Sequence, residues 1–243
     1  MIAAKELRKS YRRKHVLTGI TFTAREGEVT LLVGPNGAGK STTLKIFAGL
    51  ARADAGEATI AGHSITSQKL KAQRALSFLP QMPNFHPRFS CAQILDFYAR
   101  LRGTDRARCA FALEAAGLAE VADQSAGTLS GGMRQRLGLA LLLLPDAPVL
   151  LLDEPGISLD PPWRRKLQDV LREEARRGKT VLITTHLIAE WNNVAHRCLL
   201  CRGGTIEREL DPENLPGDFD EPEVPRSQPS QAIPPHASRP ALA

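Results

Sequence analysis

The stretch Gly34-Pro-Asn-Gly-Ala-Gly-Lys-Ser-Thr42 decides the fold, because it fits the pattern G-x-x-x-x-G-K-[ST], in which backbone N–H groups cradle phosphate. Residues 29–33 (VTLLV) precede it as a short run without alternation, typical of a buried parallel strand, and residues 43–50 follow as a helix-forming stretch. The loop glycines let N–H groups converge on phosphate oxygens, and a helix that begins near Lys40 adds the positive end of its dipole. This order of strand, loop and helix predicts a phosphate-binding loop rather than an ordinary glycine-rich turn.

Two carboxylates follow a second buried run, residues 149–152 (VLLL). Asp153 and Glu154 would lie at the carboxyl end of a strand, which is where ligands bind in open α/β sheets. We expect Lys40 to reach the β and γ phosphates, and Ser41 and Asp153 to hold Mg²⁺, a cation that prefers oxygen ligands. Glu154 is then the candidate general base that polarises an attacking water. Taken alone, the acidic pair is equally compatible with a polar strand exit.

The remaining patterns place these motifs in an α/β fold. A third buried run, residues 180–184, follows a helix that Asp160 can cap and that ends at Gly178. This helix would connect the runs 149–152 and 180–184 by a right-handed crossover. Short β-type segments in residues 1–30 and 56–64 predict a small antiparallel sheet, whereas residues 80–145 predict a helical insert with helices near 93–102 and 106–116. The predicted fold is a P-loop NTPase core with a mostly parallel central sheet, a small antiparallel β subdomain and an inserted α-helical subdomain.

Composition divides the 243 residues into a basic body and an acidic tail. Eight of the 17 prolines lie in residues 211–243, which carry a net charge of −4 and are predicted to be a disordered Pro-rich acidic tail. Since the whole chain carries a net charge of +6, residues 1–210 carry +10, and we expect them to form one domain. A basic body is compatible with nucleic acid or with the anionic face of a membrane, and charge does not choose between the two.

We also expect a cytosolic chain without disulfides or membrane spans. The four cysteines, at 91, 109, 198 and 201, are too irregular for a disulfide framework, and no apolar segment follows the basic N-terminal residues as in a signal peptide. The longest apolar run, residues 137–144, is interrupted by Pro145 and Asp146 well short of the roughly 20 residues that cross a bilayer.

The stretch Leu129-Ser-Gly-Gly-Met-Arg-Gln135 resembles the signature motif of ATP-binding cassette (ABC) ATPases, and it lies shortly before the acidic strand. Ser130 can cap a helix whose first turn holds Gly131 and Gly132, which gives a second phosphate-binding helix end. One subunit cannot present both ends to the same nucleotide. The resemblance implies a head-to-tail dimer in which Ser130 and Gly132 of one subunit contact the γ phosphate held by Lys40 of the other.

Other positions resemble further elements of the family. Tyr11 resembles the aromatic residue that stacks on adenine, Gln81 the glutamine that senses Mg²⁺ and the transporter, and His186 the histidine that contacts the γ phosphate and orients Glu154. Asp160 lies in a segment that resembles the D-loop linking the two sites, where Gly156 and Ser158 depart from the usual residues. As alternatives, Tyr11 is a half-buried strand residue, Gln81 an ordinary loop residue and His186 a structural histidine.

The resemblance implies a catalytic set of Lys40, Glu154 and His186 and a metal set of Ser41, Gln81 and Asp153. The nucleotide-binding set that it implies comprises Tyr11, Gly34, Pro35, Asn36, Gly37, Ala38, Gly39, Lys40, Ser41, Thr42, Gln81, Ser130, Gly131, Gly132 and Asp160.

The function implied is that of the ATP-binding and ATP-hydrolysing subunit of an ABC transporter, with ATP and Mg²⁺ as cofactors. We expect it to be cytoplasmic and peripheral on the inner face of the membrane, to pair with a second copy and to bind a separately encoded permease. The run GGMRQRLGLA resembles exporter-type subunits and favours export. The alternative is a soluble ABC-type ATPase acting on ribosomes or DNA, but the single cassette and the lack of a heptad run argue against a nucleic-acid partner. A P-loop kinase would leave residues 129–135 without a role.

Two further clusters have less specific interpretations. Cys198 and Cys201 have the spacing of a metal or redox pair, but in a strand residues three apart point to opposite faces, which favours two buried cysteines. The arginines at 100, 102, 106 and 108 form a basic patch in the helical insert. A solvated face is the preferred interpretation, and contact with anionic headgroups is the alternative.

Overall fold

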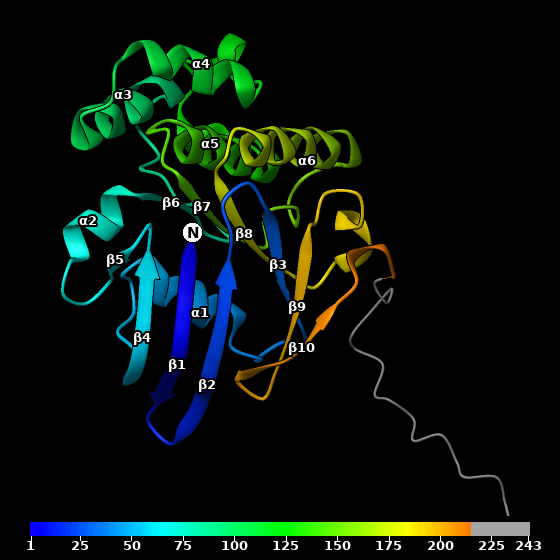
Figure 1. Ribbon diagram of the computed structural model, residues 1–243. Coiled ribbons are helices and arrows are strands. Elements are labelled where there is room, and N and C mark those ends of the chain that lie inside the picture. The colour runs from blue at the N-terminus through cyan, green and yellow to red at the C-terminus, as the bar shows by residue number, and fades with distance from the viewer. Residues whose placement is uncertain (215–243) are drawn as a thin grey trace, which may run out of the picture.

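Residues 1–214 are described by a computed structural model, in which a six-stranded sheet forms the centre of the chain (Figure 1). The sheet has the strand order β10-β9-β3-β8-β7-β6, and neighbouring strands are parallel except for the antiparallel β9–β10 pair. The three predicted buried runs are the adjacent strands β3 (Val29–Val33), β8 (Thr180–Thr185) and β7 (Val149–Asp153). The other strands are β6 (Leu76–Leu79), β9 (Arg197–Arg202) and β10 (Thr205–Leu210). The predicted mostly parallel sheet is confirmed.

Helices cover one face of this sheet, and a second sheet with a helix covers the other. Leu31 of β3 and Leu150 of β7 belong to a core completed by α5 (Gly131–Leu143) and α6 (Pro161–Arg176), which lie above the sheet in Figure 1. Leu32 and Leu151, one residue further on, belong to the core on the opposite face, because successive side chains of a strand alternate between faces. Burial on both faces explains why these strands are continuous apolar runs.

The second sheet is antiparallel, with the order β2-β1-β4-β5. Its strands are β2 (Lys14–Ala24), β1 (Ile2–Tyr11), β4 (Ala55–Ile60) and β5 (His63–Ser64), so the predicted small antiparallel sheet is confirmed. Helix α1 (Lys40–Phe47) contributes Leu44, Ile46 and Phe47 to the core that this sheet shares with the parallel sheet. The phosphate loop therefore begins on one sheet and leads into a helix that contacts both.

Helices occupy most of the stretch predicted as a helical insert. Helices α3 (Cys91–Arg102) and α4 (Ala107–Ala115) form a third core with one side of α5. Helix α3 begins two residues before the predicted start, because Ser90 and Gln93 form a capping box: Ser90 Oγ accepts from Gln93 N at 3.2 Å, and Ser90 N donates to Gln93 Oε1 at 2.9 Å. The remaining short helices are α2 (Lys69–Arg74), η1 (Ala119–Val121), η2 (Ala126–Thr128), η3 (Ile188–Trp191) and η4 (Pro212–Asn214).

The four arginines of the predicted basic patch have structural partners. Arg108 donates to the carbonyls of Leu143 and Leu144 at the end of α5, and Arg102 donates to the carbonyl of Leu76 at 2.9 Å. Arg100 and Arg106 both pair with Asp96, at 2.8 and 2.6 Å. The interpretation as a plain solvated face is therefore incomplete, because these side chains bind carbonyls at the end of α5 and the start of β6 and share one carboxylate.

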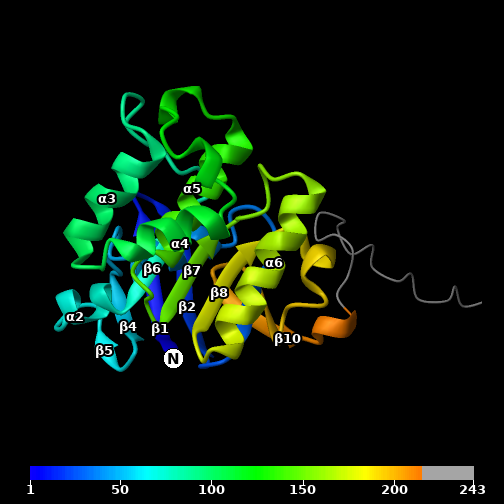
Figure 2. The same cartoon turned by 90° about the horizontal axis from the view of Figure 1, so that it is seen from above.

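Helix α6 lies over β8 and α5 lies beside it, as the view from above shows (Figure 2). No helix within residues 1–214 is long and apolar enough to cross a bilayer. Most of the tail predicted for residues 211–243 lies outside the described residues.

Replacing the fully buried Leu151 by Ala tests the central packing. We expect a loss of about 2–5 kcal/mol in the free energy of unfolding, since the cavity left between two layers can collapse only in part. Urea unfolding followed by circular dichroism measures it. The control Leu70→Ala, at a residue that is 74% exposed, should change stability by less than about 0.5 kcal/mol. Equal losses in the two variants would contradict this description of the core.

Candidate functional site

The phosphate loop runs in a conformation that only glycine adopts readily. Gly34, Gly37 and Gly39 have φ angles of 140°, 84° and 103°. A Cβ atom on Gly34 would lie 2.0 Å from the carbonyl oxygen of Cys201, and one on Gly39 would lie 2.5 Å from Cδ2 of Leu17. The loop is thus held between β9 and β2. Close contact and backbone angle together require glycine at 34 and 39, whereas at Gly37 the backbone angle alone favours it.

Lys40 begins α1 and lies inside this loop. It is 6% exposed, and its Nζ donates to the carbonyls of Gly34 at 2.6 Å and Pro35 at 3.1 Å. Gly39, the residue before the helix, makes no side-chain cap, so the helix N–H groups of the first turn face the loop without a protein side chain in the capping position. The ammonium and the helix end together form a concave, positively polarised surface suited to phosphate.

Asp153 receives two hydroxyl groups at the end of β7. Its Oδ1 accepts from Ser41 Oγ at 2.9 Å and from Thr184 Oγ1 at 2.5 Å, and the residue is 3% exposed. Thr184 was not predicted, although it lies opposite Asp153 in the β7–β8 register. The adjacent Ser41 hydroxyl and Asp153 carboxylate are oxygen donors of the kind that hold Mg²⁺, which usually takes one or two protein ligands and completes its shell with phosphate and water.

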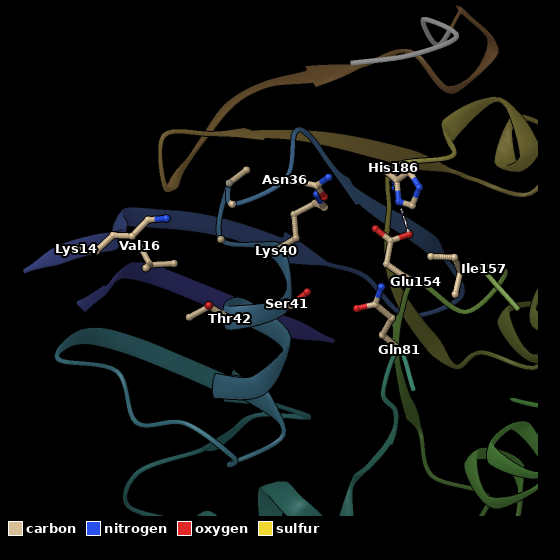
Figure 3. A pocket seen from close by; sticks show the side chains of 13 residues that line it. Lys14, Val16, Asn36, Lys40, Ser41, Thr42, Gln81, Glu154, Ile157 and His186 are labelled. Carbon is tan, nitrogen blue, oxygen red and sulfur yellow. Dashed lines mark hydrogen bonds and ion pairs between the residues drawn. The ribbon is translucent and has the colours of Figure 1, made fainter. Parts of the chain in front are cut away.

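Glu154 and His186 form a pair at the ends of two neighbouring strands. Glu154 has a left-handed φ of 48°, its N–H donates to the carbonyl of Thr184 at 2.9 Å, and it is 8% exposed. Its Oε2 lies 2.9 Å from Nδ1 of His186 and accepts from the backbone N–H of His186 at 3.3 Å (Figure 3). A strained backbone at a non-glycine residue is typical of functional sites, and here it holds the carboxylate beside the imidazole.

A cavity of about 460 Å³ connects these elements. Of the predicted residues, the loop positions Asn36 to Thr42 line it together with Gln81, Glu154 and His186 (Figure 3). Gly34, Pro35 and Asp153 do not line it but bind the side chains of Lys40 and Ser41, which do. Three lining residues were missed by the sequence patterns: Lys14, Val16 and Ile157. The only sequence signal for Lys14 is the basic run after Tyr11.

Tyr11 lies outside the cavity lining. The residue is 47% exposed at the end of β1, and Nζ of Lys9 lies 5.3 Å from its ring centroid. Its register partner on β2 is Lys14, which lines the cavity. The ring thus lies on the strand pair that forms one edge of the cavity, and its contact with a base stays a prediction.

The predicted signature helix is present, but its first residues are not part of this chain's own cavity lining. Ser130 caps α5 by accepting from Met133 N at 3.2 Å, and a Cβ on Gly131 would meet nothing within 4 Å. Ser130, Gly131 and Gly132 do not line the cavity. Asp160 likewise caps α6, with its Oδ1 accepting from Trp163 N at 2.9 Å, and its predicted role between two sites stays a prediction.

Cys198 and Cys201 contribute to cores on opposite sides of β9, as predicted. Burial raises the pKa of the Cys198 thiol to about 12 and that of Cys201 to about 11. The Cys201 thiol donates to the carbonyl of Ala38 at 2.9 Å, which adds a second contact between β9 and the phosphate loop. Residues 1–214 contain no cluster of three or more His, Cys, Asp or Glu side chains placed to hold a metal ion.

The chain combines a phosphate loop with an acidic strand end and its paired histidine. It also has a signature helix that packs against the helical subdomain. Together these features define a P-loop ATPase of the cassette type. A family model described as ABC transporter matches residues 17–156, and the chain belongs to this family. It is therefore an ATP-binding cassette that hydrolyses ATP to power transport.

Individual proteins agree with this assignment. The chain is 41% identical over 207 residues to the Nod factor export ATP-binding protein I of Burkholderia orbicola, a match that covers 83% of this chain and 68% of that protein. It superposes on the dimeric structure of a bacterial ABC transporter cassette with a TM-score of 0.80 and 26% identity, covering 88% of this chain and 100% of the other. A post-hydrolysis state of that cassette, bound to ADP and Pi, matches with a TM-score of 0.78 and 27% identity over 88% and 100% of the two chains.

Thiol labelling tests the burial of the cysteines. At pH 8, below the raised pKa values of Cys198 and Cys201, both remain protonated and enclosed, so a thiol reagent should label at most the half-buried Cys109 in the folded chain. All four cysteines should react in denaturant, and Cys109→Ser should abolish labelling of the folded protein. Rapid labelling of Cys201 in the native chain would contradict its place beneath the phosphate loop.

Proposed function

We propose that this chain is the ATPase subunit of an exporter, that it works as a homodimer and that it binds a separately encoded membrane permease from the cytoplasmic side. The proposal of a dimer is supported by the exposed N-terminal end of α5. Ser130 and Gly131 are exposed to solvent and are not part of the chain's own cavity lining. A second copy placed head to tail would bring this helix end to the phosphate held by Lys40. The dimeric form of the bacterial cassette supports the arrangement.

Export is favoured by two observations. The signature run GGMRQRLGLA resembles exporter-type subunits, and the relative from Burkholderia orbicola, 41% identical, is named for export. The transported substrate is selected by the permease, because the fold of a cassette is shared by many transport functions. Neither the relative nor the two solved structures described above supports the alternative of an ATPase acting on ribosomes or DNA.

The geometry supports a division of roles among the cavity residues. ATP would enter with its phosphates in the loop, and Lys40 would exchange the carbonyls of Gly34 and Pro35 for phosphate oxygens. Glu154 would then accept the proton of the attacking water, while His186, paired with the same carboxylate, holds it in orientation. Closure of the dimer would exclude water, and loss of the γ phosphate would reopen it.

The site also fits Mg²⁺. Ser41 and Asp153 supply the hydroxyl and carboxylate, and Gln81 lines the same cavity. The chemistry that Mg²⁺ would supply there is positive charge beside the phosphate oxygens. In this chain Thr184 orients the Asp153 carboxylate by donating to the same oxygen as Ser41.

Glu154→Gln tests the role of the candidate base. We expect turnover of ATP to fall by about 10² or more while ATP affinity changes little, since the amide cannot accept the proton but leaves the phosphate loop intact. Phosphate release and equilibrium dialysis measure the two quantities, and gel filtration with ATP should show a trapped dimer. Glu57→Gln, at an exposed position on β4, is the matched control and should behave as the wild type. Retained turnover in Glu154→Gln would remove this role.

Purification of tagged Glu154→Gln from membranes with ATP tests the transporter assignment. A polytopic membrane protein should be recovered with the trapped dimer, and its identity would narrow the substrate. The control is the double variant Lys40→Ala, Glu154→Gln, which lacks the phosphate-binding ammonium. Less of the membrane protein should be recovered with this variant. Ribosomal proteins or DNA without any membrane protein would contradict the proposal.

A further inference from the structure

The segment that follows Glu154 is held by side chains from two helices. Gln135 of α5 donates through Nε2 to the carbonyl of Pro155 at 3.1 Å. Arg164 of α6 donates through Nε to the carbonyl of Leu159 at 2.8 Å. The segment 155–159 is therefore fixed near both of its ends by Gln135 and Arg164, neither of which lines the nucleotide cavity. Within the segment, Ile157 lines the cavity.

Arg164 also reaches the segment that follows His186. Its Nη1 donates to Oε1 of Glu190, four residues after His186, and the two side chains are 30% and 28% exposed. Gln168, one turn further along α6, donates to the backbone carbonyl of Glu190 at 2.8 Å. One helix face thus binds both the carboxylate and the backbone of Glu190.

Gly156 brings the two segments into close contact. A Cβ atom at this position would lie 3.6 Å from Oε2 of Glu190, so the carboxylate borders the backbone two residues after Glu154. The segments are consequently joined in two places. At the cavity, Glu154 contacts His186, and outside it Arg164 bridges Leu159 and Glu190.

We propose that Arg164 and Glu190 are positioning residues for ATP hydrolysis, which keep the segments after Glu154 and His186 aligned so that the carboxylate and the imidazole meet. Neither side chain lines the cavity of this chain, so neither is placed to touch a nucleotide bound there. A displacement of either segment would separate Glu154 from His186 while leaving the phosphate loop in place. The inference rests on the proposed roles of Glu154 and His186.

The test compares Arg164→Gln, Glu190→Gln and the double variant in the full chain, with kcat and KM for ATP as readouts. Each single change should lower kcat about tenfold, because small misplacements of reacting groups have large effects on rate. KM should stay within about twofold, since the contacts of the phosphate loop are unchanged. The double variant should be no slower than either single variant, because the two residues act as one unit.

Arg172→Gln is the matched control. Arg172 lies on the same helix, its side chain is 29% exposed, and it pairs with Asp169 at 2.8 Å and donates to the carbonyl of Asn193. Neither contact involves residues 155–160, so its loss should leave kcat within about twofold of the wild type. Thermal unfolding of every variant separates misfolding from mispositioning.

The outcomes distinguish failure of the positioning pair from failure of the proposed role of Glu154. Wild-type kcat in Arg164→Gln and Glu190→Gln, with Glu154→Gln inactive, would overturn the positioning pair and leave the proposed function intact. Losses that multiply in the double variant, or that affect KM alone, would also overturn the pair. Turnover in Glu154→Gln would instead refute the role of the base, and the inference would fall with it. A tenfold, non-additive loss of kcat with Arg172→Gln unaffected supports the pair.

Discussion

The close contact between the Gly34 backbone and strand β9 is the constraint on which the site depends. Because the carbonyl of Cys201 occupies the place of a side chain at Gly34, the loop turns sharply as it leaves β3. The thiol of Cys201 and the ammonium of Lys40 then satisfy carbonyls of the same loop. The loop is thus a folded element with its own internal hydrogen bonds, and the sheet beneath it holds it in place.

The second requirement is that the candidate catalytic groups, which come from distant parts of the chain, reach one edge of the parallel sheet. Strands β3, β7 and β8 lie side by side, so the residues that follow them are neighbours in space although they are far apart in sequence. Ser41, Asp153 and Thr184 meet through one carboxylate oxygen, and Glu154 and His186 meet through another. The chemistry is therefore assembled by strand order and not by local sequence.

The sequence predicted those parts of the fold that are encoded locally. The buried strands are short apolar runs, the caps Ser130 and Asp160 stand directly before their helices, and the glycine pattern of the loop has a specific mechanical reason. Contacts between distant segments left no such pattern. Lys14 lines the cavity only because β2 passes beside the loop, and Arg102 and Arg108 bind backbone carbonyls that no local pattern identifies.

Helix α5 belongs to two hydrophobic cores at once. Leu139 and Leu142 pack with the parallel sheet, whereas Leu137 and Ala140 pack with α3 and α4. A helix of 13 residues is about 20 Å long. Its C-terminal half packs against both layers while its N-terminal end at Ser130 is exposed, so α5 couples the two mechanically: a rearrangement of α3 and α4 that tilted the helix would displace Ser130 more than the buried half.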